Sequence, residues 1–313
     1  MTDAASIVDV SVLVPVYNNA ATLDPLIDRL LAVLGGLGRS FEIICVDDGS
    51  RDASLSILRQ RAAGDPRLRV FALVRNFGSQ AASCAACDQA RGRHAVHIDA
   101  DLENFPEDIP ALLEPLDRGY DFVCGFRENP SGRALTRRLS SFLINAYTRR
   151  QTGVSIRDVG CGLCAFEASL IRNLAAEGEG RRLLKPVLLR RARRITEVPV
   201  RHRPRPDRGG NSFYTLLGIA MDYYLFTARR PFLIAGLFGV AALAAGLVMI
   251  ATGPRIFGLT LVGAGALAMG LSLVGEYGQR IYQLTHGTPF YALRDPDGRQ
   301  PGQQPPTRTP REA

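Results

Sequence analysis

The first hundred residues alternate between short apolar runs and longer stretches in which apolar positions recur at helical spacing. The runs cover 9–16, 41–46, 68–74 and 94–98, and the first two are rich in β-branched residues, which is typical of buried parallel strands. The stretches between them predict helices at 22–34, 53–63 and 79–90. Strands that alternate with helices predict an α/β fold with a parallel sheet and crossover helices.

Two long uncharged stretches follow much later in the chain, at 232–252 and 256–275. Each is long enough, at about 1.5 Å per residue, to cross a hydrocarbon core of roughly 30 Å. Only Gly253, Pro254 and Arg255 separate them. We therefore predict a transmembrane hairpin and keep a buried pair of core helices as the alternative.

The charges around the hairpin predict its orientation. Arg229 and Arg230 precede the first stretch and Arg280 follows the second, whereas the turn holds only Arg255. Basic residues that flank a membrane span favour the cytoplasmic side, so both ends of the hairpin are expected there. The first ten residues show no secretory signal, which is consistent with a cytoplasmic amino terminus. We expect a multi-pass protein of the inner (cytoplasmic) membrane with its main domain and both termini in the cytoplasm. Recurrent glycine and alanine in both stretches permit close helix packing and a homo-oligomer.

Length and composition bound the domain organisation. The chain has 313 residues, which is too long for one small module. Of these residues 46% are apolar and 22% are charged, and this composition argues against a fully disordered chain. The tail beyond about 295 is rich in proline, glutamine, glycine and arginine, and we expect it to be flexible. The predicted division is two halves of one α/β domain, the hairpin and the tail, at 1–130, 131–228, 229–280 and 281–313.

The net charge indicates an anionic partner. A formal charge of +8 and a pI near 9.5 suit a nucleic acid, a nucleotide or a membrane surface. The sequence has no helix-turn-helix pattern and no aromatic-rich platform, so we expect no nucleic-acid partner.

The cysteines allow two interpretations. Two C-x-x-C spacings suggest zinc or redox chemistry, at Cys84 and Cys87 and at Cys161 and Cys164. The first pair lies in an alanine-rich helical stretch, and the second lacks the turn residues of a zinc knuckle. We predict buried thiols instead, as in a reducing compartment.

Polar residues gather where three predicted strands end. The first strand ends in Pro-Val-Tyr-Asn-Asn (15–19), the second in Asp-Asp-Gly-Ser (47–50), and the last in Asp-Ala-Asp (99–101). A D-x-D motif lets two carboxylates face one divalent ion, and Mg²⁺ or Mn²⁺ suits such ligands and would hold a diphosphate. An isolated D-x-D is more often a turn or a helix cap, but its coincidence with the other strand ends favours the metal site.

Other phosphate and nucleophile motifs are absent. The sequence has no G-x-x-x-x-G-K-[ST], no strand-linked G-x-G-x-x-G and no G-x-S-x-G. Gly35, Gly36 and Gly38 follow a predicted helix, which indicates a helix stop.

Four successive blocks resemble a known family: SVLVPVYNNAATL, IICVDDGSRDAS, VRNFGSQAA and HIDADLENFPEDI. They resemble the inverting glycosyltransferases of family 2 with the GT-A fold, and specifically the polyprenyl-phosphate glycosyltransferases. This group includes dolichol-phosphate mannose synthase and undecaprenyl-phosphate sugar transferases. The resemblance covers about residues 9 to 290, including the carboxyl-terminal membrane pair. It implies a nucleotide-sugar half at 1–130 and an acceptor half at 131–228.

The resemblance also implies roles for single residues. The nucleobase and ribose would be framed by Pro15, Tyr17, Asn18 and Asp47, with Asp48 closing the same pocket. The metal ion and the donor diphosphate would be bound by Asp99 and Asp101. The sugar site would be shaped by Arg75, Asn76 and Gly78, with help from Gln80.

Asp158 resembles the acidic residue that several relatives place beside the acceptor as a base. The second pKa of a phosphate monoester is near 6, so the attacking phosphate is already ionised, and Asp158 either orients groups or removes a proton. The implied reaction is in-line attack of a lipid phosphate oxygen on the anomeric carbon, with inversion. The metal would stabilise the leaving UDP or GDP. The expected catalytic residues are Asp158, Asp101 and Arg75.

Basic residues between the nucleotide half and the membrane would receive the acceptor. An amphipathic, arginine-bearing stretch at 133–150 predicts an interfacial helix, and a second basic run at 201–208 lies close before the membrane. A solvated basic loop is the alternative for either. The candidates for the acceptor phosphate are Arg133, Arg137, Arg205, Arg208 and Ser212.

Three departures from the family pattern bear on specificity. Glu103 stands where relatives have glutamine, Phe105 where they have proline, and Phe213 where they have a basic or amide residue. A processive polysaccharide synthase is excluded because its Q-x-x-R-W motif needs tryptophan, which the chain lacks. We expect transfer of one sugar to a polyprenyl phosphate such as undecaprenyl phosphate. The alternative is an inactive, membrane-tethered scaffold of the same fold.

Overall fold

The computed structural model describes residues 8–127, 145, 149–150, 153, 156–171, 184–203, 263, 267, 270–271, 274–275, 277–278, 281 and 291–294. Contacts within the chain divide it into two compact units. The first comprises Met1–Gly210 and Phe290–Ala313, and the second comprises Asn211–Pro289. The first unit therefore contains residues that precede the second unit in the sequence and residues that follow it.

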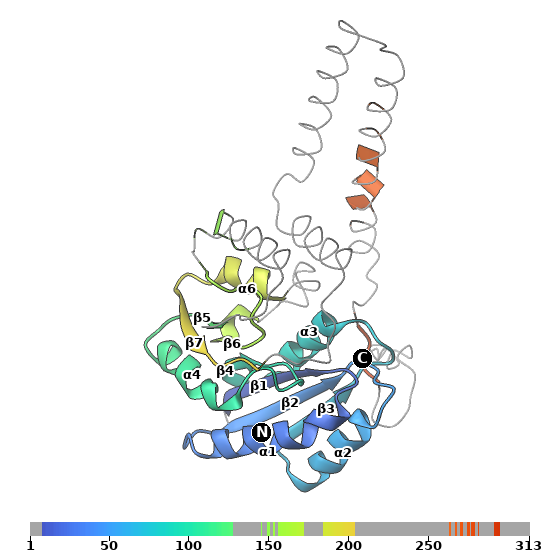
Figure 1. Cartoon of the computed structure of the whole chain (residues 1–313), viewed down its shortest axis with the longest axis vertical. Helices are drawn as coiled ribbons and strands as arrows, with labels where there is room; N and C mark the ends of the chain where they lie inside the picture. The colour runs from blue at the N-terminus through green and yellow to red at the C-terminus, as the bar shows by residue number, and fades with distance from the viewer. Residues whose placement is uncertain are drawn as a thin grey trace, which may run out of the picture. The chain divides into compact units, whose positions relative to one another are not determined.

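The first unit is built on a seven-stranded mixed sheet with the order β3-β2-β1-β4-β6-β5-β7 (Figure 1). Its strands are β1 (Val8–Val16), β2 (Phe41–Asp47), β3 (Leu68–Ala72), β4 (Gly92–His97), β5 (Phe122–Arg127), β6 (Cys164–Glu167) and β7 (Ile195–Val200). Strands β1 to β4 pair in parallel, and β6 runs antiparallel between β4 and β5. The sheet thus joins strands from both predicted halves of the domain.

The helices of the amino-terminal part confirm the predicted alternation. They are α1 (Ala20–Gly35), α2 (Ser54–Gly64) and α3 (Ser79–Gln89), and the later helices are α4 (Ile109–Asp117) and α6 (Leu184–Arg191). Short 3₁₀ turns occur at Pro106–Asp108 and Ala168–Leu170. Helix α1 ends at Gly35, as predicted for a helix stop, and Gly38 adopts a positive φ of 63° in the turn that follows.

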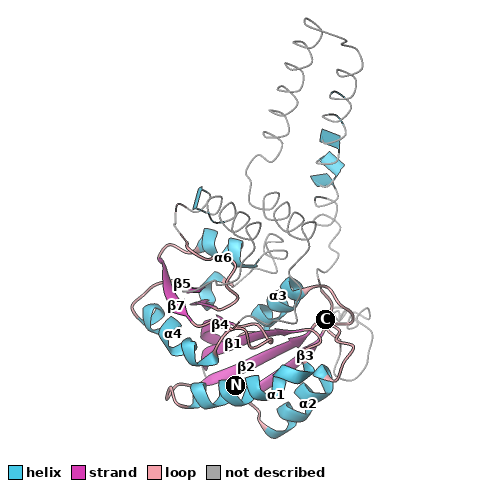
Figure 2. Cartoon of the chain, in the orientation of Figure 1, coloured by secondary structure: helices cyan, strands magenta, loops and turns pink. Residues whose placement is uncertain are grey.

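The order of the strands explains which face each helix covers. The chain moves in one direction from β1 to β3 and then steps back across the sheet to β4. Right-handed crossovers therefore place α1 and α2 on one face and α3 on the other (Figure 2). The main core joins alternate residues of β1, such as Val12 and Val14, to Leu26 of α1 and Leu112 of α4.

Helix α3 is built for close approach to the sheet. Its buried positions are small, and they include Ala81, Ala82, Ala85 and Ala86. Both Cys84 and Cys87 lie in this helix, and all six cysteines of the chain are free and buried, as predicted. Burial raises the pKa of Cys45 to about 12 and that of Cys161 to about 11, so these groups are neutral thiols at physiological pH.

The predicted transmembrane hairpin falls mostly outside the described residues. None of 232–252 is described, and from 256–275 six positions are, all of them helical. Among these, the side chains of Leu267, Leu271 and Val274 are exposed. Within the described part of the chain, no helix is long and apolar enough to cross a membrane. The hairpin remains a prediction.

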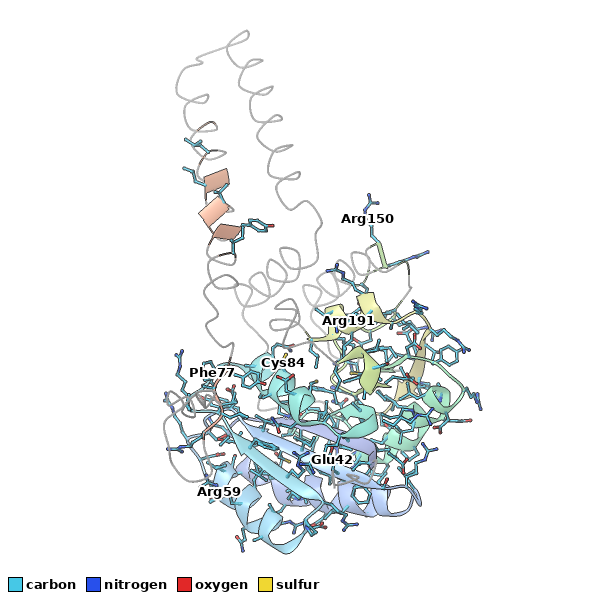
Figure 3. All side chains as sticks on the ribbon, turned by 180° about the vertical axis from the view of Figure 1, so that it is seen from behind. Glu42, Arg59, Phe77, Cys84, Arg150 and Arg191 are labelled. Carbon is cyan, nitrogen blue, oxygen red and sulfur yellow. The ribbon has the colours of Figure 1, made fainter. Side chains whose placement is uncertain are left out.

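A buried polar network joins the amino-terminal ends of the first four strands. Glu42, which Figure 3 labels within the sheet, accepts hydrogen bonds from Ser11 Oγ at 2.6 Å, Arg69 Nη1 at 2.7 Å and the Arg91 amide at 2.7 Å. The Gly92 amide donates to Ser11 Oγ at 2.8 Å. Each charged or polar group thus has a partner, which offsets the cost of burying it. This end of the sheet is structural, and the opposite end carries the loops.

Acid should destabilise the sheet through His94, which lies in β4 and is 3% exposed. Burial lowers the pKa of its imidazole below the ordinary value, and its Nε2 has no hydrogen-bond partner. The unfolded chain therefore binds the proton more tightly, so stability is lost as the pH falls below about 6.5. We expect the unfolding temperature in detergent to fall by about 2 to 4 °C between pH 7.5 and 5.5. In His94→Leu this difference should disappear, and an equal fall in the variant would contradict the assignment.

Candidate active site

A cavity of about 290 Å³ lies at the carboxyl ends of β1, β2 and β4. It collects the loops that follow three strands of a parallel sheet, where ligands of such folds bind. The lining residues are Pro15, Val16, Tyr17, Asn19, Asp48, Asn76, Gly78, Ser79, Ala82, Asp99, Ala100 and Asp101. Seven of the residues predicted for the donor and metal sites thus share one cavity, namely Pro15, Tyr17, Asp48, Asn76, Gly78, Asp99 and Asp101. Four others do not line it, namely Asn18, Asp47, Arg75 and Gln80.

The loop after β1 is held by its two asparagines. Asn18, at a positive φ of 52°, accepts a hydrogen bond from the Arg51 amide through Oδ1 at 2.8 Å. Asn19 accepts one from the Tyr17 amide at 3.1 Å. These bonds fix the loop and leave the Tyr17 ring 37% exposed at the cavity. Asn18 therefore acts on the cavity indirectly, by holding the loop that carries Tyr17.

The two aspartates after β2 have different surroundings. Asp48 accepts hydrogen bonds from the amides of Phe77 at 2.7 Å and Gly78 at 2.9 Å. Burial raises the pKa of this carboxyl group, although the two amides oppose the shift. Asp47 accepts from the Ser50 amide through Oδ2 at 3.1 Å, and its buried Oδ1 has no partner. Asp48 thus holds the segment 75–78, which we call the donor loop, and Asp47 keeps an acceptor atom free.

The donor loop also depends on Gly49. This residue has a φ of +67°, and a Cβ there would lie 2.7 Å from the Arg75 carbonyl carbon and from the Asn76 amide nitrogen. Any side chain at position 49 would push the donor loop away. Figure 3 labels Phe77 on this loop, where the Arg75 guanidinium lies over the Phe77 ring at 4.6 Å. Arg75 does not line the cavity.

Gly49→Ala should therefore impair donor binding. We expect the donor KM to rise about tenfold, since a displacement near 1 Å in a binding loop has effects of this order or larger. Gly38→Ala is the matched control, because Gly38 has a φ of +63° but no atom within 4 Å of the point where a Cβ would lie. Both variants carry the left-handed strain of about 1 to 2 kcal/mol, and only the first disturbs the donor loop. Equal donor KM values in the two variants would contradict this role.

The D-x-D motif places two carboxylates on the cavity. Asp101 is 7% exposed and accepts a hydrogen bond from the Glu103 amide through Oδ1 at 3.1 Å. Between the two acids, the Ala100 carbonyl accepts from Thr22 Oγ1 at 2.7 Å, which ties the motif to α1. Among the described residues, no group of three or more acidic, histidine or cysteine side chains is arranged to hold a metal. Asp99 and Asp101 could hold an ion only if a substrate and water supply its other ligands.

The segment 158–163, which we call the acceptor loop, packs against the same motif. The Gly162 carbonyl accepts a hydrogen bond from His97 Nδ1 at 2.8 Å, and the Cys161 carbonyl accepts one from Lys185 Nζ at 2.8 Å. A Cβ on Gly162 would come within 1.9 Å of Asp99 Oδ2. The acceptor loop is therefore fixed from β4 and α6 and lies in direct contact with the D-x-D.

Asp158 begins the acceptor loop and is engaged in an ion pair. Its two oxygens accept from Arg127 Nε at 2.5 Å and Nη2 at 2.7 Å, and the side chains are 13% and 16% exposed. Although burial acts to lower it, the Asp158 carboxylate raises the pKa of Arg127. Asp158 does not line the cavity. This geometry favours the orienting role that the sequence left open over proton removal.

The two described departures from the family pattern contact the segment that directly follows β7. Glu103 Oε2 lies 3.3 Å from His202 Nε2, and the Glu103 carbonyl accepts from the Arg203 amide at 2.9 Å. The Phe105 ring packs under three guanidinium groups, those of Arg29, Arg201 and Arg203, at 5.1, 5.0 and 5.8 Å. Both residues therefore anchor the basic segment that follows β7.

Several predicted residues lie elsewhere. Gln80 accepts from the Leu184 amide at 3.1 Å and so caps the start of α6 rather than lining the cavity. The acceptor-phosphate candidates and one departure fall outside the described residues, namely Arg133, Arg137, Arg205, Arg208, Ser212 and Phe213. Of the predicted interfacial stretch, Asn145, Arg149 and Arg150 are described, and the two arginines are exposed.

The sequence reasoning missed four residues of the acceptor side, namely His97, Arg127, Gly162 and Lys185. Lys185 is the only lysine of the chain, which was a usable signal. The other three carry no motif of their own, because their partners are distant in the sequence.

Comparison with known proteins places the chain in a family. Residues 11–175 match the model of glycosyl transferase family 2. The undecaprenyl-phosphate 4-deoxy-4-formamido-L-arabinose transferase of Edwardsiella ictaluri (strain 93-146) is 35% identical over 94% of this chain and 96% of that protein. Its counterpart from Pseudomonas paraeruginosa (strain DSM 24068 / PA7) is 38% identical over 76% of this chain and 71% of that protein.

Solved structures share the fold. Mannosyl-3-phosphoglycerate synthase from Rubrobacter xylanophilus matches with a TM-score of 0.52 and 20% identity, over 70% of this chain and 74% of that one. Glucosyl-3-phosphoglycerate synthase from Mycobacterium tuberculosis, in complex with Mn²⁺, UDP and phosphoglyceric acid, matches with a TM-score of 0.51 and 22% identity, over 72% and 78%. These matches confirm the expected GT-A-like α/β sheet. With its sheet, its strand-end acids and the matched sequence, the chain belongs to glycosyl transferase family 2.

Proposed function

We propose that the protein transfers one sugar from a nucleoside diphosphate to undecaprenyl phosphate, with inversion at the anomeric carbon. The observation that carries this proposal is the match to the Edwardsiella transferase, which extends over nearly the full length of both chains. A match confined to the nucleotide-sugar half, residues 1–130, would support only the use of a similar donor by the two proteins. The named activity of the relatives makes 4-deoxy-4-formamido-L-arabinose the first sugar to test.

The cavity suits a nucleotide-sugar donor. Tyr17 offers a ring face for a base, and the buried Oδ1 of Asp47 is an acceptor near the same strand end that lacks a hydrogen-bond partner. An imide or amide N–H of uracil or guanine would satisfy such an atom. Asn76 and Gly78 of the donor loop line the same cavity as Tyr17 and the D-x-D. The donor is therefore UDP- or GDP-linked in our proposal.

The donor set at the D-x-D fits Mg²⁺ or Mn²⁺. Such ions are often held by one or two carboxylates together with substrate phosphates and water, and Asp99 and Asp101 are two carboxylates on one cavity. When bound, the ion would neutralise the charge that develops on the departing diphosphate. The chain itself contributes the alignment of the two acids, through the Glu103 amide and the contact of Gly162 with Asp99.

For the acceptor phosphate, correct orientation matters more than a protein group that removes a proton. A lipid phosphate is largely ionised at neutral pH, so its oxygen attacks without losing a proton to the protein. Asp158, held by Arg127, and Lys185 fix the acceptor loop beside the D-x-D. We assign Asp158 and Arg127 as positioning residues. The acceptor phosphate would be held by the arginines and Ser212 of the basic run that continues from Arg203.

The path of the chain supports the proposed topology. The segment 211–289 leaves the first unit, and residues 292–294 return to it by pairing with Ala72 and Val74. Both ends of that segment therefore lie on one side of any membrane it enters, which requires an even number of crossings. A hairpin with spans at 232–252 and 256–275 meets this requirement. We propose that the first unit and both termini face the cytoplasm.

The test is a transfer assay on the full chain in detergent. Undecaprenyl phosphate is offered with radiolabelled UDP and GDP sugars, including a donor of 4-deoxy-4-formamido-L-arabinose, with Mn²⁺, Mg²⁺ or EDTA. We expect a lipid-linked product that EDTA abolishes and that Asp101→Ala loses. The control is Asp24→Ala, since Asp24 is an exposed α1 residue away from the cavity lining. No product from any donor, with nucleotide binding intact, would favour the inactive scaffold.

A further inference from the structure

The chain that returns from the second unit adds to the edge of the sheet. Strand β3 is the edge strand, and the pairing continues one residue beyond it, where the Leu73 amide donates to the Asp47 carbonyl at 2.8 Å. On the other side, the Val74 amide donates to the Ala292 carbonyl at 3.0 Å. The Arg294 amide donates to the Ala72 carbonyl at 2.6 Å. Leu73 and Leu293 form an antiparallel bridge between these two bonds. Residues 291–294, which we call the strap, thus pair with the chain just before the donor loop.

A second contact joins the strap to the helix that follows the donor loop. The Tyr291 hydroxyl donates to the Asp88 carboxylate, near the carboxyl end of α3. Val74 immediately precedes Arg75, and Ser79 begins α3 immediately after Gly78. The strap therefore touches both segments that flank the donor loop.

The donor loop has few other supports. Val74, Arg75 and Asn76 are exposed, so their side chains do not anchor it in the core. On its inner side it is held by Asp48 and by the close approach of Gly49. At its leading end, the Leu73 amide bonds the Asp47 carbonyl, and the strap adds the hydrogen bonds of Val74 and Ala72. A loop held this way moves if either side is released.

We infer that the strap positions the donor loop, and that Tyr291 and the Arg294 amide are positioning groups for nucleotide-sugar binding. Docking of the strap and binding of the donor favour the same arrangement of residues 72–78, so each stabilises the other. The strap begins two residues after the second unit ends at Pro289. This role rests on the proposed function only in that the cavity binds a nucleotide.

The first test removes one strap hydrogen bond. Arg294→Pro deletes the amide that donates to Ala72, and Arg294→Ala is the matched control that loses the same exposed side chain but keeps the amide. The probes are UDP and GDP with Mn²⁺, bound to the full chain in detergent and followed by calorimetry. We expect Arg294→Pro to bind the preferred nucleotide about fivefold to tenfold more weakly than the control, which corresponds to one hydrogen bond. Tyr291→Phe should weaken it about twofold to threefold.

Kinetics separate positioning from general destabilisation. In Arg294→Pro the donor KM should rise by the same factor, while kcat, the acceptor KM and the unfolding temperature stay near those of Arg294→Ala. Equal nucleotide affinity in the proline variant and its control would overturn the inference. So would a parallel loss of kcat, acceptor affinity and thermal stability, because that pattern belongs to a purely structural segment.

A cross-link tests the geometry without activity. Leu73 and Leu293 are a non-hydrogen-bonded antiparallel pair, whose Cβ atoms lie close enough for a disulfide. In Leu73→Cys/Leu293→Cys, diamide should oxidise the two thiols to a disulfide within one chain, and nucleotide affinity should match the wild type. Failure to cross-link in the folded protein would overturn the docked strap. A cross-link in a chain whose wild type binds neither nucleotide would instead refute the proposed function, and the positioning role with it.

Discussion

Replacing Gly162 with alanine is expected to reduce sugar transfer at least about a hundredfold. The new Cβ would lie 1.9 Å from Asp99 Oδ2, 2.9 Å from Asp99 Cγ and 3.2 Å from Asn104 Nδ2. Either the acceptor loop or the Asp99 carboxylate must move by about 1 Å or more, and errors of that size in aligned reacting groups cost about a hundredfold in rate. The measurement is kcat/KM for transfer to undecaprenyl phosphate at several Mn²⁺ concentrations.

The control for this variant lies two residues earlier. A Cβ at Gly160 would be 3.5 Å from Arg127 Nη2 and 3.6 Å from Asp158 Oδ1, which are ordinary contacts. Gly160→Ala should therefore keep most of the activity. If Gly162→Ala transfers sugar as well as Gly160→Ala, the contact between the acceptor loop and Asp99 has no part in catalysis.

Breaking the ion pair of Asp158 should have the second large effect. Asp158→Asn leaves the Arg127 guanidinium, 16% exposed, without its counter-charge. Removing one partner of a buried pair destabilises a protein by about 3 to 5 kcal/mol. We expect a loss of this size in the free energy of unfolding for Asp158→Asn and for Arg127→Met. The double variant should recover much of it, because no unpaired charge remains.

The pH profile of Asp158→Asn separates the two roles of this residue. If Asp158 only orients the acceptor loop, the acidic limb of kcat stays near pH 6, where the lipid phosphate becomes protonated. The rate then falls by a similar factor at every pH. A general base would give another result, in which the acidic limb disappears with the carboxylate. That outcome would show that Asp158 removes a proton during the reaction.

Local patterns explain why the amino-terminal part of the fold could be predicted. Strands β1 and β2 are buried on both faces and appear as apolar, β-branched runs. The buried residues of α1 recur with a period near 3.6 residues. The later strands could not be predicted in this way. β6 has four residues, Cys164–Glu167, and exists because it fits antiparallel between β4 and β5. Its pairing is a property of the assembled sheet.

Some residues of the site could likewise be predicted from local sequence, and others could not. Asp48, Asp99 and Asp101 could be placed together in advance, because the carboxyl ends of parallel strands meet at one edge. The pairing of Asp158 with Arg127 joins residues 31 positions apart, and no local spacing encodes it. The same holds for the strap, in which Arg294 pairs with Ala72 from the far end of the chain.

The α/β pattern of the first hundred residues, the acidic strand ends and the resemblance to family 2 transferases could all be recognised without coordinates. Each of these depends on residue types at short spacings, which a linear pattern contains. Three contacts of the site required the folded chain: Asp48 holds the donor loop, Gly162 lies against Asp99, and Asp158 pairs with Arg127. Such contacts arise when distant segments pack, because burial selects partners by shape and charge across the fold and not by their distance along the chain.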